Sequence, residues 1–97
     1  MKKYIANAFS LQMLAELPAS IHVEKCAKEE ALSEDNYSVV GHPDTARVLG
    51  ASFNRVSVKV MKGDIVYVAQ VVGGRLPEGC TELPEGFTMA FLKVTIG

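Results

Sequence analysis

The stretch VVGHPDTA, residues 39–46, has the pattern of an apolar strand that passes directly into a helix. Its two valines predict the end of a buried strand, and Gly41 permits a sharp turn because it lacks a Cβ atom. Pro43 suits the first position of a helix, where the N–H group that it lacks would be unpaired anyway. The sequence therefore predicts that His42 lies at the C-terminal end of a strand and at the start of a helix.

The predicted position of His42 fits two roles. In open α/β sheets, ligands bind outside the carboxyl ends of the strands, and free backbone N–H groups at the start of a helix attract anions. A histidine beside a phosphate-sized anion site is a candidate general acid or base. The same position also suits an ordinary capping or turn residue, and position alone does not choose between the two roles.

A second stretch, GGRLPEG at residues 73–79, follows an apolar run at residues 65–72. Gly73 and Gly74 end a strand and let another molecule approach the backbone closely. Arg75 carries a planar fork of donors that matches the geometry of phosphate. The alternative is an Arg75–Glu78 ion pair that only stiffens the turn, since exposed pairs are common and contribute little free energy.

Strand and helix patterns alternate along the chain and predict one α/β domain, residues 1–97. The predicted sheet is mixed, has about five strands and is flanked by short helices. Its central strand is residues 65–72, which are apolar on both faces. Strands are predicted at residues 3–6, 20–25, 37–40, 56–60, 65–72 and 87–96, with 56–60 and 65–72 joined as a hairpin, and helices at residues 11–17, 27–32 and 43–49.

The charge balance argues against duplex DNA as a partner. The chain of 97 residues has a formal net charge of -1, so no basic field attracts DNA or RNA over a distance. A domain of this size buries a modest fraction of its surface, so association with a second copy would help to stabilise it. Any polyanion must meet local positive charge, which the chain offers at Arg47, Arg55, Lys59, Lys62 and Arg75.

The sequence predicts no metal site, no disulfide framework and no membrane segment. Cys26 and Cys80 lie far apart without C-x-x-C spacing, and His22 and His42 do not complete a zinc signature with them. We therefore expect two separate thiols in a reducing cytoplasm. The N-terminal residues contain only a short, interrupted apolar stretch, so neither a signal peptide nor a membrane span is expected.

Three blocks of the sequence carry a family resemblance. They are YIANAFSLQML at residues 4–14, SVVGH at residues 38–42 followed by Thr45 and Ala46, and VAQ at residues 68–70 followed by GGRLPEG. In this order, and over nearly the whole chain, they resemble the viral ring nucleases. These are the type III anti-CRISPR family of archaeal viruses, phages and related mobile elements. Each block alone is a weak signal, and the three together are specific.

The resemblance implies a substrate and a reaction. The substrate would be cyclic tetra-adenylate, the ring-shaped second messenger made by type III CRISPR complexes. The reaction would be phosphodiester cleavage without metal or cofactor, by attack of a ribose 2′-hydroxyl on the neighbouring phosphorus. Linear di-adenylates with a cyclic 2′,3′-phosphate end would form, and loss of the messenger would silence host effector nucleases. A ring with equivalent halves suits a two-fold symmetric homodimer, expected in the cytoplasm of the host cell.

By the same resemblance, three residues would carry the chemistry. His42 is the expected general acid for the departing 5′-oxygen, and Arg75 would bind phosphate and stabilise charge in the transition state. Glu78 would orient one of these two or assist proton transfer. The residues expected to bind substrate are Asn7, Ser10 and Gln70 at ribose and base, with Gly41, Gly73, Gly74 and Arg47 around them.

Several of these residues also fit simpler roles. Ser10 suits a plain helix cap, and Gln70 suits a polar sheet position with a hydrogen-bonding neighbour. Arg47 suits a solvated position on a helix, and the helix dipole accounts for Asp44 in the first turn. Two other classes of protein stay open. One is a non-catalytic module that sequesters or senses a cyclic oligonucleotide, and the other is a small structural or regulatory protein of a mobile element in which His42 is a turn residue.

Overall fold

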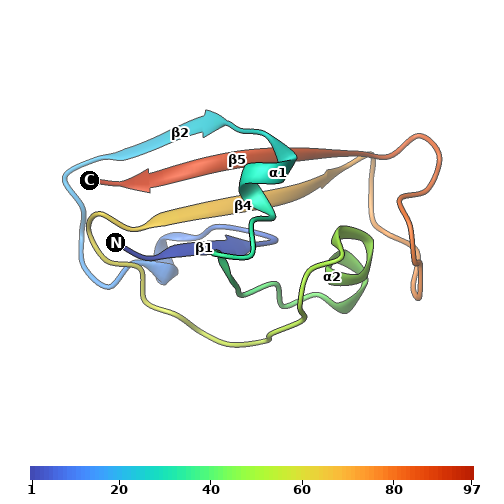
Figure 1. Cartoon of the computed structure of the whole chain (residues 1–97), viewed down its shortest axis with the longest axis horizontal. Coiled ribbons are helices and arrows are strands. Elements are labelled where there is room, and N and C mark those ends of the chain that lie inside the picture. The colour runs from blue at the N-terminus through green and yellow to red at the C-terminus, as the bar shows by residue number, and fades with distance from the viewer.

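Strand β4 (Ile65–Val72) is the middle strand of a five-stranded mixed sheet with the order β2-β5-β4-β1-β3 (Figure 1). The computed structural model describes residues 1–97. β4 pairs in parallel with β1 (Lys3–Ala6) and antiparallel with β5 (Thr88–Ile96). Its first five side chains are buried, because the chain covers both faces of the sheet there. The predicted α/β class and the apolar central strand are confirmed.

Three strands of the sheet run in the same direction. β1 also pairs in parallel with β3 (Tyr37–Ser38), so the carboxyl ends of β1, β3 and β4 lie at the same end of the sheet. The antiparallel part consists of β5 and the edge strand β2 (Ile21–Lys25). β3 is shorter than the predicted strand at residues 37–40, because Val40 forms its bridge with Phe53 rather than with β1.

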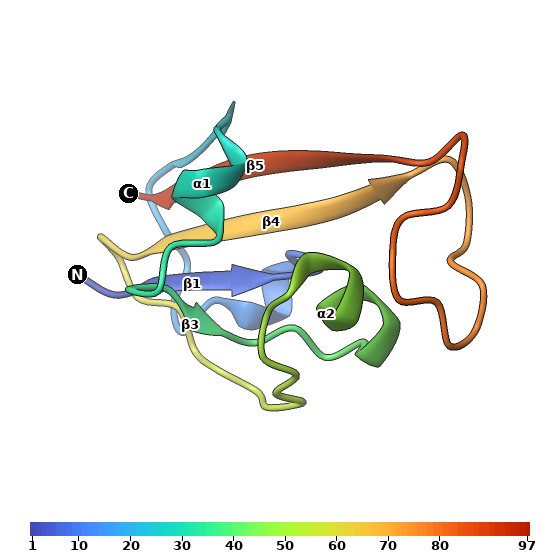
Figure 2. The same ribbon diagram turned by 45° about the vertical axis from the view of Figure 1, so that its right-hand side comes forward.

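Both α-helices cover the same face of the sheet. Figure 2 shows α1 (Lys28–Ala31) over β4 and β5, and α2 (Pro43–Leu49) beside the end of β1. α2 keeps its predicted bounds, because Pro43 occupies the first turn and Gly50 ends the helix in the left-handed conformation at φ 73°. Neither helix has the length and the continuous apolar character that crossing a membrane requires.

The opposite face of the sheet is covered only in part. The 3₁₀ turn η1 (Leu11–Met13) and residues 56–60 lie over its parallel half. The buried side chains on this face are Tyr4, Ala6, Val39, Val60, Val66, Val68, Val94 and Ile96. The cover stops before the edge strand β2, where Ile21 and Val23 remain 38% and 53% exposed.

The helix predicted at residues 11–17 is wrong. The chain forms only the single turn η1 there, and Leu14 is already extended. The backbone that would continue the helix pairs instead with Val60, which donates to the Met13 carbonyl at 2.7 Å and accepts from the Ala15 N–H at 2.9 Å. A helix of two turns is marginal by itself, so bonds to a distant segment replace it.

The hairpin predicted between residues 56–60 and 65–72 is also wrong. Only Val60 joins a ladder, in a parallel bridge with Leu14. Both sides of β4 are already occupied, by β1 and by β5, so no hydrogen-bonding edge of β4 is free for a preceding strand. Asp64 ends the connection by accepting from the backbone N–H groups of Met61 at 2.9 Å and Lys2 at 3.0 Å.

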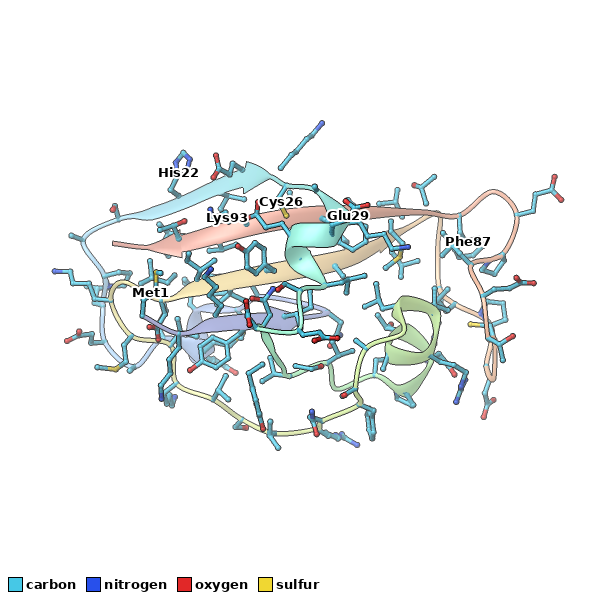
Figure 3. The ribbon with its side chains drawn as sticks, in the orientation of Figure 1. Met1, His22, Cys26, Glu29, Phe87 and Lys93 are labelled. Atoms are coloured by element: carbon cyan, nitrogen blue, oxygen red, sulfur yellow. The ribbon has the colours of Figure 1, made fainter.

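Ionisable side chains fasten α1 to the sheet. The Tyr67 hydroxyl donates to Glu30 Oε2 at 2.7 Å, and Lys93 Nζ lies 3.5 Å from the same oxygen. Burial and the bond to Glu30 raise the pKa of Tyr67 to about 12, while the Tyr67 hydroxyl lowers the pKa of Glu30. Burial, reinforced by the Glu30 carboxylate, raises the pKa of the Cys26 thiol. Cys26 and Lys93 lie beside α1 (Figure 3), so these perturbed groups belong to the packing of that helix.

Candidate functional site

The carboxyl ends of the parallel strands gather most of the residues that the sequence singles out. Asn7 directly follows β1, His42 lies between β3 and α2, and Gln70 lies near the end of β4. Because β1, β3 and β4 are parallel, these residues lie toward the same end of the sheet. Residues 73–87, which we call the β4–β5 loop, leave from this end and lie beside α2 (Figure 2).

Asn7 ties the end of β1 to the turn before His42. Its Oδ1 accepts a hydrogen bond from the backbone N–H of Gly41 at 3.1 Å. Gly41 is half-buried, so this bond satisfies a donor that the sheet ladder no longer pairs. Asn7 therefore fixes the path of the backbone that carries the imidazole.

His42 is the residue before the first turn of α2, and its side chain caps the helix. Nδ1 accepts from the Thr45 N–H at 3.3 Å, with the Thr45 hydroxyl 3.4 Å away. The predicted position of His42 is confirmed, and so is its capping role. With Nδ1 accepting, the proton of the neutral ring is on Nε2. His42 is exposed, so capping leaves Nε2 free for a ligand.

The two ends of the β4–β5 loop touch each other. Gly73 adopts φ 127°, and a Cβ atom added there would lie 3.0 Å from the Gly86 carbonyl oxygen and 3.1 Å from Phe87 Cα. The close approach expected at Gly73 is therefore made by this chain's own backbone. Gly74 has nearly the same φ, 125°, but only Phe87 Cζ comes near it, at 3.9 Å.

The far side of the β4–β5 loop is fastened to α2. Asp44 Oδ1 accepts from the Gly79 N–H at 3.2 Å and from Arg47 Nη1 at 2.8 Å. Arg47 Nη1 also donates to the Cys80 carbonyl at 3.1 Å. Sequence reasoning assigned Asp44 to the helix dipole and missed this contact. The Asp44–Arg47 spacing was a visible signal, but Asp44 and Gly79 are 35 positions apart in the sequence, so their contact could not be predicted from it.

Arg75 and Glu78 lie in the β4–β5 loop and are both exposed. The ion pairs of the chain are His22–Glu24, Asp44–Arg47 and Glu30–Lys93, so Arg75 and Glu78 do not pair with each other. The alternative of an Arg75–Glu78 pair that stiffens the turn is therefore wrong. Arg47 is engaged by Asp44 and Cys80, whereas the guanidinium of Arg75 has no carboxylate partner.

Gln70 and Ser10 face cavities on the side of the sheet away from the α-helices. Gln70 is exposed and, with Asn7, lines a cavity of about 320 Å³ whose other walls are mostly apolar. Ser10 lines a neighbouring cavity of about 580 Å³ together with Lys59. Ser10 occupies the predicted N-cap position, but it precedes the single turn η1 and its side chain makes no capping bond.

The site offers proton transfer and charge but no set of metal ligands. No three His, Cys, Asp or Glu side chains come together where they could hold a metal ion. His42 supplies a proton-transfer group, and Arg75 supplies a cation without an ion-pair partner. The amide side chains of Asn7 and Gln70 line the separate cavity on the other side of the sheet, which contains neither His42 nor Arg75. The combination of His42 and Arg75 suits an anionic ligand.

Comparison with known proteins gives the family. Residues 3–88 match the model of the STIV B116-like family, a viral protein family, and the chain belongs to it. The fold is similar to that of B116 of Sulfolobus turreted icosahedral virus, with a TM-score of 0.77 and 24% sequence identity over 98% of this chain and 99% of that chain. A comparison with curated proteins gave no match.

Proposed function

We propose that this protein is a metal-independent ring nuclease that cleaves cyclic tetra-adenylate and thereby suppresses type III CRISPR signalling in the host cell. The observation that supports the proposal most is the hydrogen bond from Gly79 of the β4–β5 loop to Asp44, which lies two residues after His42 at the start of α2. The loop contains Arg75, which is exposed and has no carboxylate partner. The three sequence blocks that resemble ring nucleases supply these same residues.

The proposed reaction is an internal transesterification. The ribose 2′-oxygen attacks the adjacent phosphorus and forms the cyclic 2′,3′-phosphate, while the bond from phosphorus to the 5′-oxygen breaks. Protonated His42 gives its proton to the departing 5′-oxygen, and the 2′-hydroxyl proton passes to Glu78 or to solvent. Two such cuts convert the ring into two linear di-adenylates, with no oxidant, reductant or water consumed.

The capping geometry of His42 leaves Nε2 as the nitrogen that can donate a proton to a ligand. His42 is exposed, and its Nδ1 lies 3.3 Å from the Thr45 backbone nitrogen and 3.4 Å from the Thr45 hydroxyl oxygen. When the ring is protonated, Nδ1 becomes a donor, and the hydroxyl oxygen of Thr45 can accept from it. Protonation ends the bond from the Thr45 N–H, so the buried Thr45 then contacts the imidazole through its hydroxyl group.

Arg75 is the counterpart of His42 on the other side of the phosphate. Its planar guanidinium can hold two phosphate oxygens and stabilise the charge that develops on them in the transition state. Glu78, three residues later in the same loop, would orient Arg75 or assist proton transfer. Asn7, Ser10 and Gln70 would contact ribose and base from the β1 and β4 sides.

The proposal includes a homodimer. A ring of four identical nucleotides has equivalent halves, and a two-fold pair of subunits would set one His42 at each of two opposite phosphodiesters. The uncovered side chains of Ile21 and Val23 give a second copy apolar surface to bury. A monomeric mass at micromolar concentration, together with full activity, would contradict this part of the proposal.

The test is incubation of the protein with labelled cyclic tetra-adenylate in excess chelator, followed by analysis of the products. We expect multiple turnovers to linear di-adenylates with cyclic 2′,3′-phosphate ends. His42→Ala should slow the single-turnover rate by about 10²- to 10⁴-fold. The matched control is His22→Ala, which alters the chain's other histidine on the exposed strand β2 and should not change the rate. If one cyclic tetra-adenylate is bound per site and no products form, the protein is a sequestering module instead.

A further inference from the structure

The β4–β5 loop is held at two places, and the second hold connects the two halves of the proposed site. Its ends meet where Gly73 packs against Gly86 and Phe87. Its far side is held by a single carboxylate oxygen, Oδ1 of Asp44, which accepts from Gly79 N–H and from Arg47 Nη1. We call Asp44, Arg47 and the loop residues that they bind, Gly79 and Cys80, the loop latch.

The loop latch lies next to the proposed reacting groups on both sides. Asp44 follows His42 by two residues in the first turn of α2, and Gly79 directly follows Glu78. Arg75 is three residues before Glu78, so the two Cα atoms lie within about 11 Å of each other. Pro77 stands between them and restricts the backbone further. Fixing Gly79 against Asp44 therefore limits where Arg75 and Glu78 can lie relative to His42.

Arg47 has a defined place in this arrangement. The same Nη1 atom donates to Asp44 at 2.8 Å and to the Cys80 carbonyl at 3.1 Å. It therefore connects the helix carboxylate with the loop backbone one residue beyond Gly79. Its charge is balanced by Asp44, whose side chain is only 13% exposed. Arg47 is thus occupied within the chain, and Arg75 is left as the cation of this loop.

We infer that Asp44 and Arg47 are positioning residues that hold the β4–β5 loop on α2, so that Arg75 and Glu78 act on the same phosphate as His42. Asp44 and Arg47 contact the loop backbone and not the substrate. They affect the reaction only through Arg75 and Glu78, which belong to the same loop. The inference about the reaction rests on the proposed function, whereas the hold on the loop is a property of the fold that can be measured without substrate.

The hold is tested by hydrogen exchange of the Gly79 amide, which donates to Asp44. In Asp44→Ala this amide should exchange at least about tenfold faster, because its acceptor is removed. Asp44→Asn keeps an oxygen that can accept from Gly79 but loses the charge that holds Arg47, so it should show a smaller increase. Glu24→Ala on β2 is the control and should leave Gly79 unchanged. If the Gly79 amide exchanges at the same rate in Asp44→Ala and in the unaltered protein, Asp44 does not hold the loop and the inference is wrong.

The positioning role is tested by a double-mutant cycle on the single-turnover rate. Asp44→Ala alone should slow cleavage about tenfold, as misplacement of a reacting group does. In an Arg75→Ala background the same change should cost less than about twofold, since the residue it positions is already gone. A merely structural role would lower the rate by the same factor in both backgrounds, and that result would overturn the positioning role. Lack of cleavage by the unaltered protein would refute the proposed function, while the exchange experiment would still decide the latch.

Discussion

The Oδ1 atom of Asn7 accepts a hydrogen bond from the backbone N–H of Gly41 at 3.1 Å, across 34 residues of sequence. This bond joins the end of β1 to the turn that presents His42. The bond gives Asn7 a structural function that does not depend on a ligand. Ser10 is the comparison for separating this function from ligand binding, because Ser10 is exposed and its side chain makes no capping bond.

We predict that Asn7→Ala lowers the free energy of unfolding by about 1–3 kcal/mol, because the half-buried Gly41 N–H loses its acceptor. Ser10→Ala should change stability by less than about 0.5 kcal/mol, as exposed substitutions usually do. Denaturant unfolding of both variants checks this. If both residues contact the ring, each variant also weakens ring binding. Equal stability of Asn7→Ala and the unaltered protein would show that the bond between Asn7 and Gly41 does not stabilise the fold.

The paired glycines of the β4–β5 loop provide a matched test of close packing. Gly73 and Gly74 have nearly equal φ, 127° and 125°, so alanine at either position meets the same backbone strain, about 1–3 kcal/mol. Only at Gly73 would the new Cβ also meet backbone atoms, at 3.0 and 3.1 Å. Gly73→Ala should therefore be more destabilising than Gly74→Ala by about 1–3 kcal/mol. Thermal unfolding measures the difference, and equal effects would show that the loop ends separate in solution.

The packing of α1 should make stability depend on pH at both extremes. The pKa of Glu30 is lower in the folded state than in the unfolded state. The contribution of Glu30 to folding stability is therefore present above its unfolded-state pKa and is lost as the pH falls through its folded-state pKa. The pKa of Tyr67 is raised to about 12, so its contribution is present below the unfolded value near 10 and is lost as pH rises toward 12.

Tyr67→Phe should therefore flatten the loss of stability at both low and high pH. Tyr37→Phe is the control, because Tyr37 is 52% exposed and is not bonded to Glu30. Unfolding curves measured across the pH range test the prediction, together with phenolate absorbance during alkaline titration. If the stability of Tyr67→Phe depends on pH in the same way as that of the unaltered protein, the hydrogen bond from the Tyr67 hydroxyl to Glu30 does not contribute to stability.

Arg75 and His42 should be distinguishable by binding. Arg75→Ala should weaken both ring affinity and the single-turnover rate, each by about 1.5–3 kcal/mol for a lost charge-assisted bond. Arg75→Lys keeps the charge without the planar fork, so it should restore only part of either quantity. Lys62→Ala removes a charge near the opposite end of β4 and should change neither. Unaltered binding and rate in Arg75→Ala would leave Arg75 outside the site.

The sequence was informative where a local pattern and its tertiary environment agree. Residues 65–72 are apolar on both faces and form the central strand, and Pro43 with Gly50 sets both ends of α2. His42 could be placed because strand, turn and helix signals meet within a few residues. The Asn7 bond to Gly41 shows how the same end of the sheet is completed by a residue from another strand.

Sequence reasoning failed where distant backbone groups compete for the same segment. Residues 11–17 have a helical pattern, but the bonds between Met13, Ala15 and Val60 use that backbone differently. The alternating pattern of residues 56–60 predicts a strand, but it does not reveal that β1 and β5 already occupy both sides of β4. The contact between Asp44 and Gly79 was hidden for the same reason, since neither residue signals its partner.

The contact of Gly73 with Gly86 and Phe87 has a consequence for how this protein can change over evolutionary time. Because the two ends of the loop close on each other, the strands β4 and β5 are joined independently of what lies between residues 74 and 86. Closing a longer or shorter loop costs free energy that grows only slowly with its length. Insertions, deletions and substitutions within this segment can therefore accumulate with little effect on the sheet, so that what the loop recognises can diversify while the fold stays constant.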